Sequence, residues 1–139
     1  MHGLSGSGKT RKSAQLLQSL PAVRVRSDLE RKRLFGITPN HRPRPGEEVG
    51  LYAPDATRKT YAELARICET GIRSGFNMIA DATFLQRARR KHFHQLAERC
   101  RARFAIYTCD APVWELQKRI LERNVQDRDA SDATLKVLE

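Results

Sequence analysis

Hydrophobic and polar positions along the chain follow two spacings, one typical of amphipathic helices and one typical of buried strands. Between residues 55 and 74, apolar side chains recur at the i, i+3, i+4 spacing of a single helical face. Short apolar runs bounded by turn residues predict strands instead. The predicted helices are 8–20, 55–74, 87–101 and 112–123, with one or two helical turns at 28–35, and the predicted strands are 22–26, 76–80 and 104–109.

Because strands alternate with helices, we expect a parallel sheet covered by helices on both faces. The strand at 104–109 should be buried. In the helix that follows, Trp114 should belong to the core, and Val113, Leu116 and Ile120 should face inward. Residues 36–50 form an irregular loop rich in proline and glycine, of a length that is usually functional or mobile. Ligands of such sheets bind at the carboxyl ends of the strands, so polar residues that follow strands are the first candidates for a site.

Composition narrows the class of protein further. The chain has 139 residues, 40% of them hydrophobic, which is the size of one domain with its own core, spanning residues 1–139. Its 26 lysines and arginines outnumber 16 acidic residues, and the net charge of +10 favours polyanionic partners such as nucleotides or nucleic acid. Three cysteines without a C-x-x-C pair indicate neither a disulfide framework nor a zinc site, so we expect a reduced, cytoplasmic setting. No apolar run is long enough to predict a membrane span.

A glycine-rich segment at the start of the chain matches the pattern G-x-x-x-x-G-K-[ST]. It comprises Gly3, Leu4, Ser5, Gly6, Ser7, Gly8, Lys9 and Thr10. Its glycines let backbone N–H groups surround a phosphate, and the helix that follows directs its positive end at the same point. Lys9 would reach the β- and γ-phosphates, and the Thr10 hydroxyl would bind Mg²⁺. The alternative is a flexible leader rich in glycine and serine.

A phosphate-binding loop normally follows a strand, but only Met1 and His2 precede Gly3. We therefore expect the chain to be a fragment that lacks this first strand. Because that strand is central in such folds, its absence should leave neighbouring strands without a partner.

Three aspartates lie just past predicted strand ends. Asp28 could accept the proton of an attacking hydroxyl, or it could cap the helix that starts at Leu29. Asp81 ends the run FNMIAD and could orient Mg²⁺ or its water, or serve as a cap. Asp110 precedes Ala-Pro and is interpreted as a turn residue.

Several arginines have either a functional or a solvated interpretation. Arg119, Arg123 and Arg128 could neutralise charge on a transferred phosphoryl group from a lid, or they could form a solvated face. Arg31, three residues past Asp28, could hold an acceptor substrate, again with a solvated alternative. The basic run at 87–91 is normally a solvated face, but it could contact a phosphate backbone if the acceptor is nucleic acid.

With these residues in view, the chain resembles the small P-loop kinases, a group that includes gluconate kinase, zeta-toxin-like kinases and polynucleotide 5′-kinase domains. It looks most similar to the predicted ATP-binding kinase domain associated with aminoglycoside-phosphotransferase-like proteins, so such a domain is a possible fused or neighbouring partner. The resemblance implies a three-layer α/β/α P-loop NTPase fold, here lacking its first and last strands. The matching blocks are GLSGSGKT (3–10), VRSDLERKRLFG (25–36), LYAPDATRKTY (51–61), ADATFL (80–85) and CDAP (109–112), together with the spaced Arg119 and Arg123 and the run Ser131-Asp132-Ala133.

The resemblance also implies roles for individual residues. The lysine and threonine that end the loop are the nucleotide and Mg²⁺ residues. Asp28 matches the acid that serves as base in polynucleotide kinases, and Arg31 matches the position three beyond it. Asp81 matches the acid after the third strand, and Arg123 matches the lid arginine.

The sequence therefore supports three hypotheses about function. The leading hypothesis is an ATP-dependent phosphotransferase that moves the γ-phosphoryl group to a hydroxyl of a small molecule or a nucleic-acid end, with Asp28 as base and Arg123 or Arg128 over the transition state. The second is an ATP-binding switch or ATPase that regulates a partner or fused domain. The third and weaker one is a basic nucleic-acid-binding module or polynucleotide 5′-hydroxyl kinase. The sequence contains no motif that specifies the acceptor.

Overall fold

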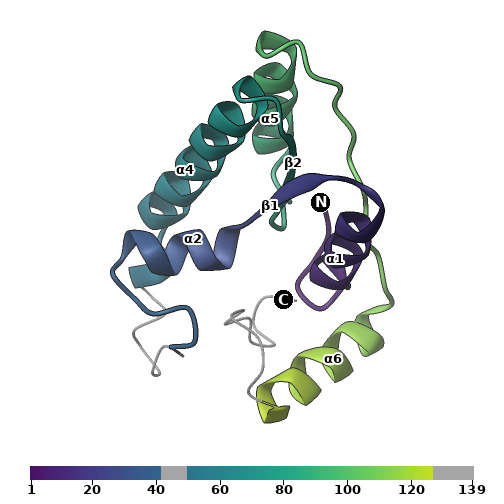
Figure 1. Cartoon of the computed structure of the whole chain (residues 1–139). Coiled ribbons are helices and arrows are strands. Elements are labelled where there is room, and N and C mark those ends of the chain that lie inside the picture. Colours follow the sequence, from purple (N-terminus) through teal and green to yellow (C-terminus); the bar gives the residue numbers. More distant parts are fainter. Residues whose placement is uncertain (42–49, 127–139) are drawn as a thin grey trace.

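The computed structural model describes residues 1–41 and 50–126, with the side chains of Ile120 and residues 123–126 left out of the description. Helices and strands alternate along this part of the chain (Figure 1). The elements are α1 (Lys9–Ser19), β1 (Ala22–Arg26), α2 (Ser27–Leu34), α4 (Pro54–Arg73), β2 (Asn77–Asp81), α5 (Arg87–Arg99) and α6 (Val113–Gln126). All five predicted helical segments are present within a few residues of their expected bounds. None of the described helices is both long and apolar enough to cross a membrane.

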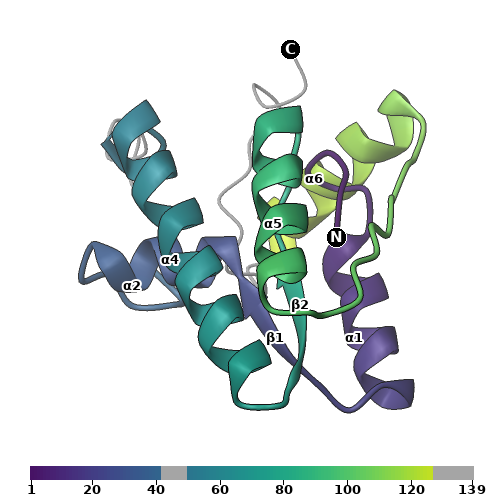
Figure 2. The same ribbon diagram turned by 90° about the horizontal axis from the view of Figure 1, so that it is seen from above.

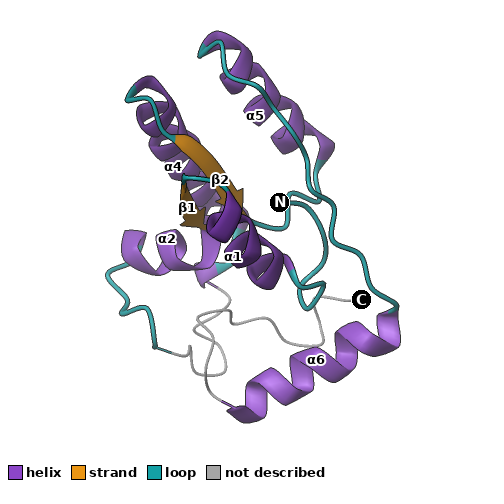
Figure 3. Ribbon diagram, turned by 45° about the vertical axis from the view of Figure 1, so that its right-hand side comes forward, coloured by secondary structure: helices purple, strands orange, loops and turns teal. Residues whose placement is uncertain are grey.

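The two strands form a parallel pair, drawn in orange in Figure 3. Their register places Ala22 beside Asn77 and Arg26 beside Asp81, so both strands end at the same edge of the sheet. This arrangement confirms the predicted strands at 22–26 and 76–80. It also brings the segments that follow both strands to one place.

Helices cover both faces of this sheet, as Figure 2 shows for α1 and α4. Successive side chains of a strand point to opposite faces. Accordingly, Val25 is buried in the core beside α4, whereas Arg24 is hydrogen-bonded to α1. The predicted α/β fold, with a parallel sheet between helical layers, is therefore confirmed.

The core lies between the sheet, α4 and α5. Leu64 is fully buried at its centre, and the ring of Phe84 makes edge-on contacts with Tyr61 and Phe93 at centroid distances of 5.2 and 4.8 Å. Phe84 has a φ of 50°, and its N–H donates to the Tyr61 hydroxyl, which holds this unusual backbone in place. Burial of one such side chain contributes about 1.5–3 kcal/mol. The remaining core residues are Val25, Ala65, Cys68, Ala82 and Leu96.

The predicted buried strand at 104–109 is wrong. This segment follows α5 as a loop in Figure 3, and Phe104, Ile106 and Tyr107 are exposed. Its only ladder contact in the described structure is with His2, whose N–H donates to Tyr107 O at 2.8 Å and whose carbonyl accepts from Cys109 N–H at 2.8 Å. A single bridge is not a ladder, so within the described residues the apolar run has no extended neighbour along most of its length.

The first turn of α6 also departs from the expectation. Trp114 and Val113 are 66% and 58% exposed, although both were expected to face the core. Leu116, one turn further along, is 1% exposed and does face inward as expected. The apolar stripe of this helix therefore begins at Leu116.

Candidate functional site

The phosphate-binding motif folds as a tight turn that leads into α1. Gly6 and Gly8 have φ values of 83° and 88°, in the left-handed region that favours glycine, and Ser7 N–H donates to Leu4 O at 3.2 Å. Gly8 is the N-cap of α1, and the first turn of this helix holds no acidic residue. Its first N–H groups are therefore available to an anion, as expected at a helix N-terminus that follows a glycine-rich loop.

Gly3 anchors the base of this loop. It has a φ of 141°, its N–H donates to Thr83 O at 3.1 Å, and a Cβ placed on it would lie 2.2 Å from the Cys109 carbonyl oxygen. The loop is thus held between the turn after β2 and the segment before α6. Beside it, the Met1 amino group donates to Ala80 O at 2.8 Å. Burial lowers the pKa of that amino group, and the negative charge of Asp81 opposes the shift.

Lys9 is turned back onto the loop that precedes it. Its Nζ donates to Leu4 O at 2.7 Å. The ammonium group therefore lies beside the turn that would surround a phosphate. A phosphate oxygen could replace the carbonyl as its acceptor without a change of backbone.

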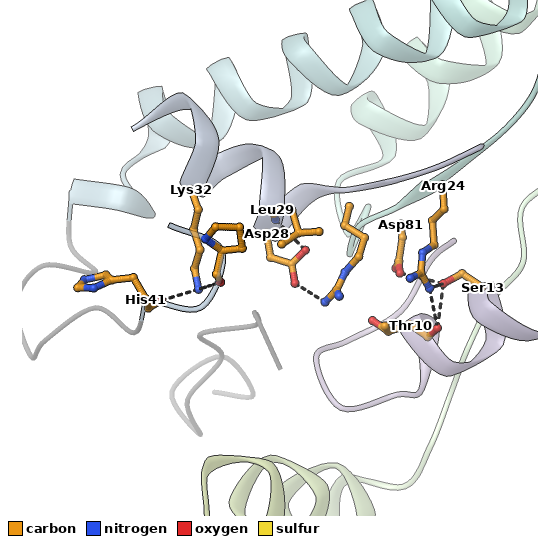
Figure 4. Close-up of polar contacts among 10 residues, drawn as sticks. Thr10, Ser13, Arg24, Asp28, Leu29, Lys32, His41 and Asp81 are labelled. Carbon is orange, nitrogen blue, oxygen red and sulfur yellow. Dashed lines mark hydrogen bonds and ion pairs between the residues drawn. The ribbon is translucent and has the colours of Figure 1, made fainter. Parts of the chain in front are cut away.

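A polar network joins α1 to both strands (Figure 4). Ser13 Oγ lies 2.9 Å from Asp81 Oδ2 and 3.0 Å from Thr10 O. Arg24 NH1 donates to Thr10 O and to Ser13 Oγ, both at 3.1 Å. Ser13 and Asp81 are 0% and 5% exposed, so the network is shielded from water. The structure thus brings Thr10 and Asp81, two residues predicted to hold Mg²⁺, into one connected group.

The residues present fit a magnesium ion bound together with nucleotide phosphates. Mg²⁺ usually keeps several waters and takes one or two protein oxygens plus phosphate oxygens. Thr10 supplies a hydroxyl, and Asp81 accepts a hydrogen bond on Oδ2 alone among the described residues, which leaves Oδ1 for the ion or its water. No cluster of three or more acidic, histidine or cysteine residues occurs in residues 1–41 and 50–126, so the phosphates would have to complete such a site.

Asp28 lies in the first turn of α2, at the same edge of the sheet (Figure 4). Its Oδ2 accepts from Arg26 NH2 at 2.7 Å, and its Oδ1 accepts from Leu29 N–H at 3.0 Å. The N-cap of α2 is Arg26, so the alternative that placed Asp28 at the N-cap is wrong. The carboxylate is nevertheless favoured where it lies, because negative charge is stabilising near a helix N-terminus.

Arg31 makes structural contacts. It is 6% exposed, and its guanidinium donates to Leu51 O at 2.5 Å and to Thr57 Oγ1 at 3.2 Å. It also lies 4.6 Å above the centroid of the Tyr52 ring. The solvated alternative for Arg31 is therefore wrong, and these contacts connect α2 to the start of α4.

One of the three predicted lid arginines reaches the loop. Arg119 NH1 donates to Gly6 O at 3.2 Å, and NH2 is paired with Glu115 one turn earlier. The guanidinium therefore lies against the turn that would bind phosphate. Arg123 is in α6, but its side chain lies outside the described residues, as does the whole of Arg128.

The basic run that opens α5 is only partly solvated. Arg90 NH1 donates to the carbonyl oxygens of Phe84 and Leu85 at 2.6 and 2.7 Å. Arg89 lies 4.1 Å above the centroid of the Tyr61 ring. These two arginines brace the turn after β2, so the interpretation of the whole run as a solvated face is wrong for them.

Sequence reasoning missed Ser13, Arg24 and Lys32. Lys32 is 1% exposed, and its Nζ donates to Pro39 O at 3.2 Å and to His41 O at 2.7 Å. The run AVRVR did hold a signal for Arg24, because alternation places its arginines on the face opposite its valines. For Ser13 the signal was its position three residues after Thr10, which puts both on one side of the helix.

Comparison with known proteins identifies the family of the chain. The family model described as an AAA domain (AAA_33) matches residues 1–139. Among curated proteins, no sequence matches the chain. The family consists of P-loop kinase-like domains. A domain of this kind implies nucleotide binding, typically with Mg²⁺. The chain therefore belongs to this AAA domain family of P-loop kinase-like proteins.

Proposed function

We propose that this chain is an ATP-dependent phosphotransferase that moves the γ-phosphoryl group of ATP to a hydroxyl acceptor. One observation carries the proposal. The phosphate-binding loop, Asp81 and Asp28 meet at a single edge of the sheet, where Arg26 of β1 lies beside Asp81 of β2. In open α/β sheets this edge is where ligands bind.

The loop and α1 hold the triphosphate in this proposal. Backbone N–H groups of residues 6–10 face the phosphates, and Lys9 Nζ exchanges the carbonyl of Leu4 for a phosphate oxygen. The Thr10 hydroxyl and the Asp81 carboxylate would hold Mg²⁺, which neutralises charge on the β- and γ-phosphates when it is bound. Arg119, which contacts Gly6 O of the loop, would exchange this carbonyl for an oxygen of the same phosphates.

Asp28 is the proposed base. Its Oδ2 accepts the proton of the acceptor hydroxyl as that oxygen bonds to the γ-phosphorus, and ADP leaves with the electrons of the broken bond. Arg26 holds the carboxylate in position through its 2.7 Å contact. We assign Arg123 to the lid over the transferred group on the resemblance alone, and Arg128 to the same lid on its place in the sequence shortly after Arg123. The resemblance would put Arg31 on the acceptor side, but its contacts with Leu51 O and Thr57 Oγ1 favour a structural role.

A second function is favoured by a specific observation. Both oxygens of Asp28 are already engaged, by Arg26 and by Leu29 N–H. A carboxylate held in this way could simply stabilise α2, in which case the chain would be an ATP-binding switch or ATPase. Turnover of ATP that no acceptor stimulates would support this second function.

The test separates binding from transfer. ATP binding is measured by calorimetry with Mg²⁺, and transfer is measured with γ-labelled ATP against 5′-hydroxyl oligonucleotides, nucleosides and hexoses. Lys9→Ala should abolish measurable binding. Asp28→Asn should leave ATP affinity within about twofold and lower transfer about 10²- to 10⁴-fold, the usual contribution of a general base.

The matched control is Asp55→Asn, because Asp55 is an exposed aspartate that is also paired with an arginine, Arg58. This control should leave both binding and transfer unchanged. Undiminished transfer by Asp28→Asn would overturn the assignment of the base. Binding that does not depend on Lys9 would overturn the proposed function altogether.

A further inference from the structure

A charged network lies behind the proposed magnesium ligands. Arg24 extends from β1 and donates from one nitrogen to Thr10 O and to Ser13 Oγ, both at 3.1 Å. Ser13 in turn lies 2.9 Å from Asp81 Oδ2. In the described part of the chain, no carboxylate lies within ion-pair distance of Arg24. Its positive charge therefore faces Asp81 through a single buried hydroxyl.

The proton of Ser13 decides how this network works. A serine hydroxyl has one proton and two lone pairs, so Ser13 can donate to Thr10 O or to Asp81 Oδ2, but not to both. Arg24 already donates to Thr10 O and to a lone pair of Ser13. The one arrangement that satisfies every group directs the Ser13 proton to the Asp81 carboxylate. Hydrogen bonds to an ionised acceptor are also the stronger ones.

We propose that Arg24 and Ser13 are positioning residues that orient Asp81 and Thr10 for Mg²⁺ bound with the nucleotide. Arg24 acts on Thr10 through its backbone carbonyl and on Asp81 through Ser13. With Oδ2 held by Ser13, the Asp81 carboxylate is fixed in one orientation, which leaves Oδ1 for the metal or its water. Partners of this kind, one step removed from the ion, typically change metal affinity 10- to 100-fold when they are removed. The inference rests on the proposed function, because it concerns the same site.

Mg²⁺ dependence of nucleotide binding is the readout, since a merely structural role would not change it. Binding of ATP is titrated by calorimetry on the 139-residue chain, once with excess Mg²⁺ and once with EDTA. Ser13→Ala and Arg24→Gln should weaken ATP binding about 10-fold with Mg²⁺ and less than twofold with EDTA. Arg24→Lys keeps a cation with several donors and should restore part of the difference.

Two matched controls lie in α1, the helix that contains Ser13. Ser19→Ala removes an exposed hydroxyl that also bonds a carbonyl three residues earlier, Leu16 O at 3.3 Å, and Arg11→Gln removes an exposed arginine. Both should bind ATP like the wild type under either condition. Thermal unfolding without nucleotide checks that each variant folds. If Ser13→Ala does not fold, Arg24→Gln at its half-buried position carries the same test.

The outcomes separate the two levels of the proposal. If the wild type binds ATP neither with Mg²⁺ nor with EDTA, the proposed function is overturned, and this inference with it. If Mg²⁺ strengthens ATP binding by the wild type and strengthens it equally in Ser13→Ala and Arg24→Gln, this inference alone is overturned. Equal losses with Mg²⁺ and with EDTA would also overturn it, because the network would then support only the loop's shape.

Discussion

Gly3 is the residue whose substitution tests the geometry of the site most directly. An alanine Cβ at this position would lie 2.2 Å from the Cys109 carbonyl oxygen and 2.8 Å from Ser7 Oγ. The φ of 141° is also one that residues with a side chain rarely adopt. Gly3→Ala therefore combines backbone strain with a clash against backbone that cannot rotate away.

The two costs can be sized separately. Strain from such a backbone conformation costs about 1–3 kcal/mol. Separating Cβ from a carbonyl oxygen needs a shift of roughly 1 Å in packed backbone, and overpacking of this kind costs about 1–3 kcal/mol. The expected loss is therefore about 2–6 kcal/mol, a large part of the 5–15 kcal/mol that stabilises a typical domain.

Gly36→Ala is the matched control, because Gly36 has a φ of 66° but nothing within 4 Å of an added Cβ. It should lose only the cost of a left-handed backbone, about 1–2 kcal/mol. Urea unfolding measures both variants, and ATP titration should show weakened binding for Gly3→Ala alone. If Gly3→Ala loses no more stability than Gly36→Ala, the close approach of the loop to Cys109 is not a constraint on this fold.

Two further predictions follow from ionisable groups. Burial raises the pKa of the Cys68 thiol to about 11, so about one molecule in a thousand carries its thiolate at pH 8. A thiol-reactive disulfide should label only the half-buried Cys100 and Cys109 quickly, and rapid loss of a third thiol before denaturant is added would contradict this. Hydrogen bonds from Arg66 lower the pKa of Glu63 to about 2, below its unfolded value of roughly 4.3. Its stabilising contribution is therefore present above pH 5 and lost as the pH falls toward 2, and urea unfolding of Glu63→Gln should approach that of the wild type over this range.

The helices could be predicted because each is specified by its own residues. The stripe of α4 repeats over many turns, and Leu64 and Cys68 are buried as the spacing requires. The predictions of β1 and β2 are correct because each of these strands pairs with the other along its length. The segment at 104–109 has the same apolar character, but a strand needs a neighbour along its length, and only His2 lies beside it in the described structure. Local pattern cannot report whether that neighbour exists.

The residues of the candidate site also differ in how far the sequence could predict them. The loop from Gly3 to Thr10 was recognisable because its spacing alone specifies a phosphate-binding turn. Arg24 was not, because the alternation in AVRVR places its side chain on the face opposite the valines but does not indicate which residues of the covering helix it contacts. Ser13 was also missed, since its hydroxyl acquires a role only when Asp81 of β2 lies 2.9 Å away.

The arginines show why charge alone could not settle the roles at this edge of the sheet. Arg31 and Arg119 were both assigned a functional and a solvated interpretation from sequence, yet one is buried against Leu51 O and the other contacts the loop at Gly6 O. A guanidinium that already satisfies buried carbonyls cannot leave them without a cost of about 1–3 kcal/mol for each acceptor left unpaired. Arg119 is 41% exposed, so water can replace its contacts when it turns toward a phosphate. Exposure beside the loop, rather than positive charge, therefore makes Arg119 the described arginine best able to exchange its present partner for a nucleotide.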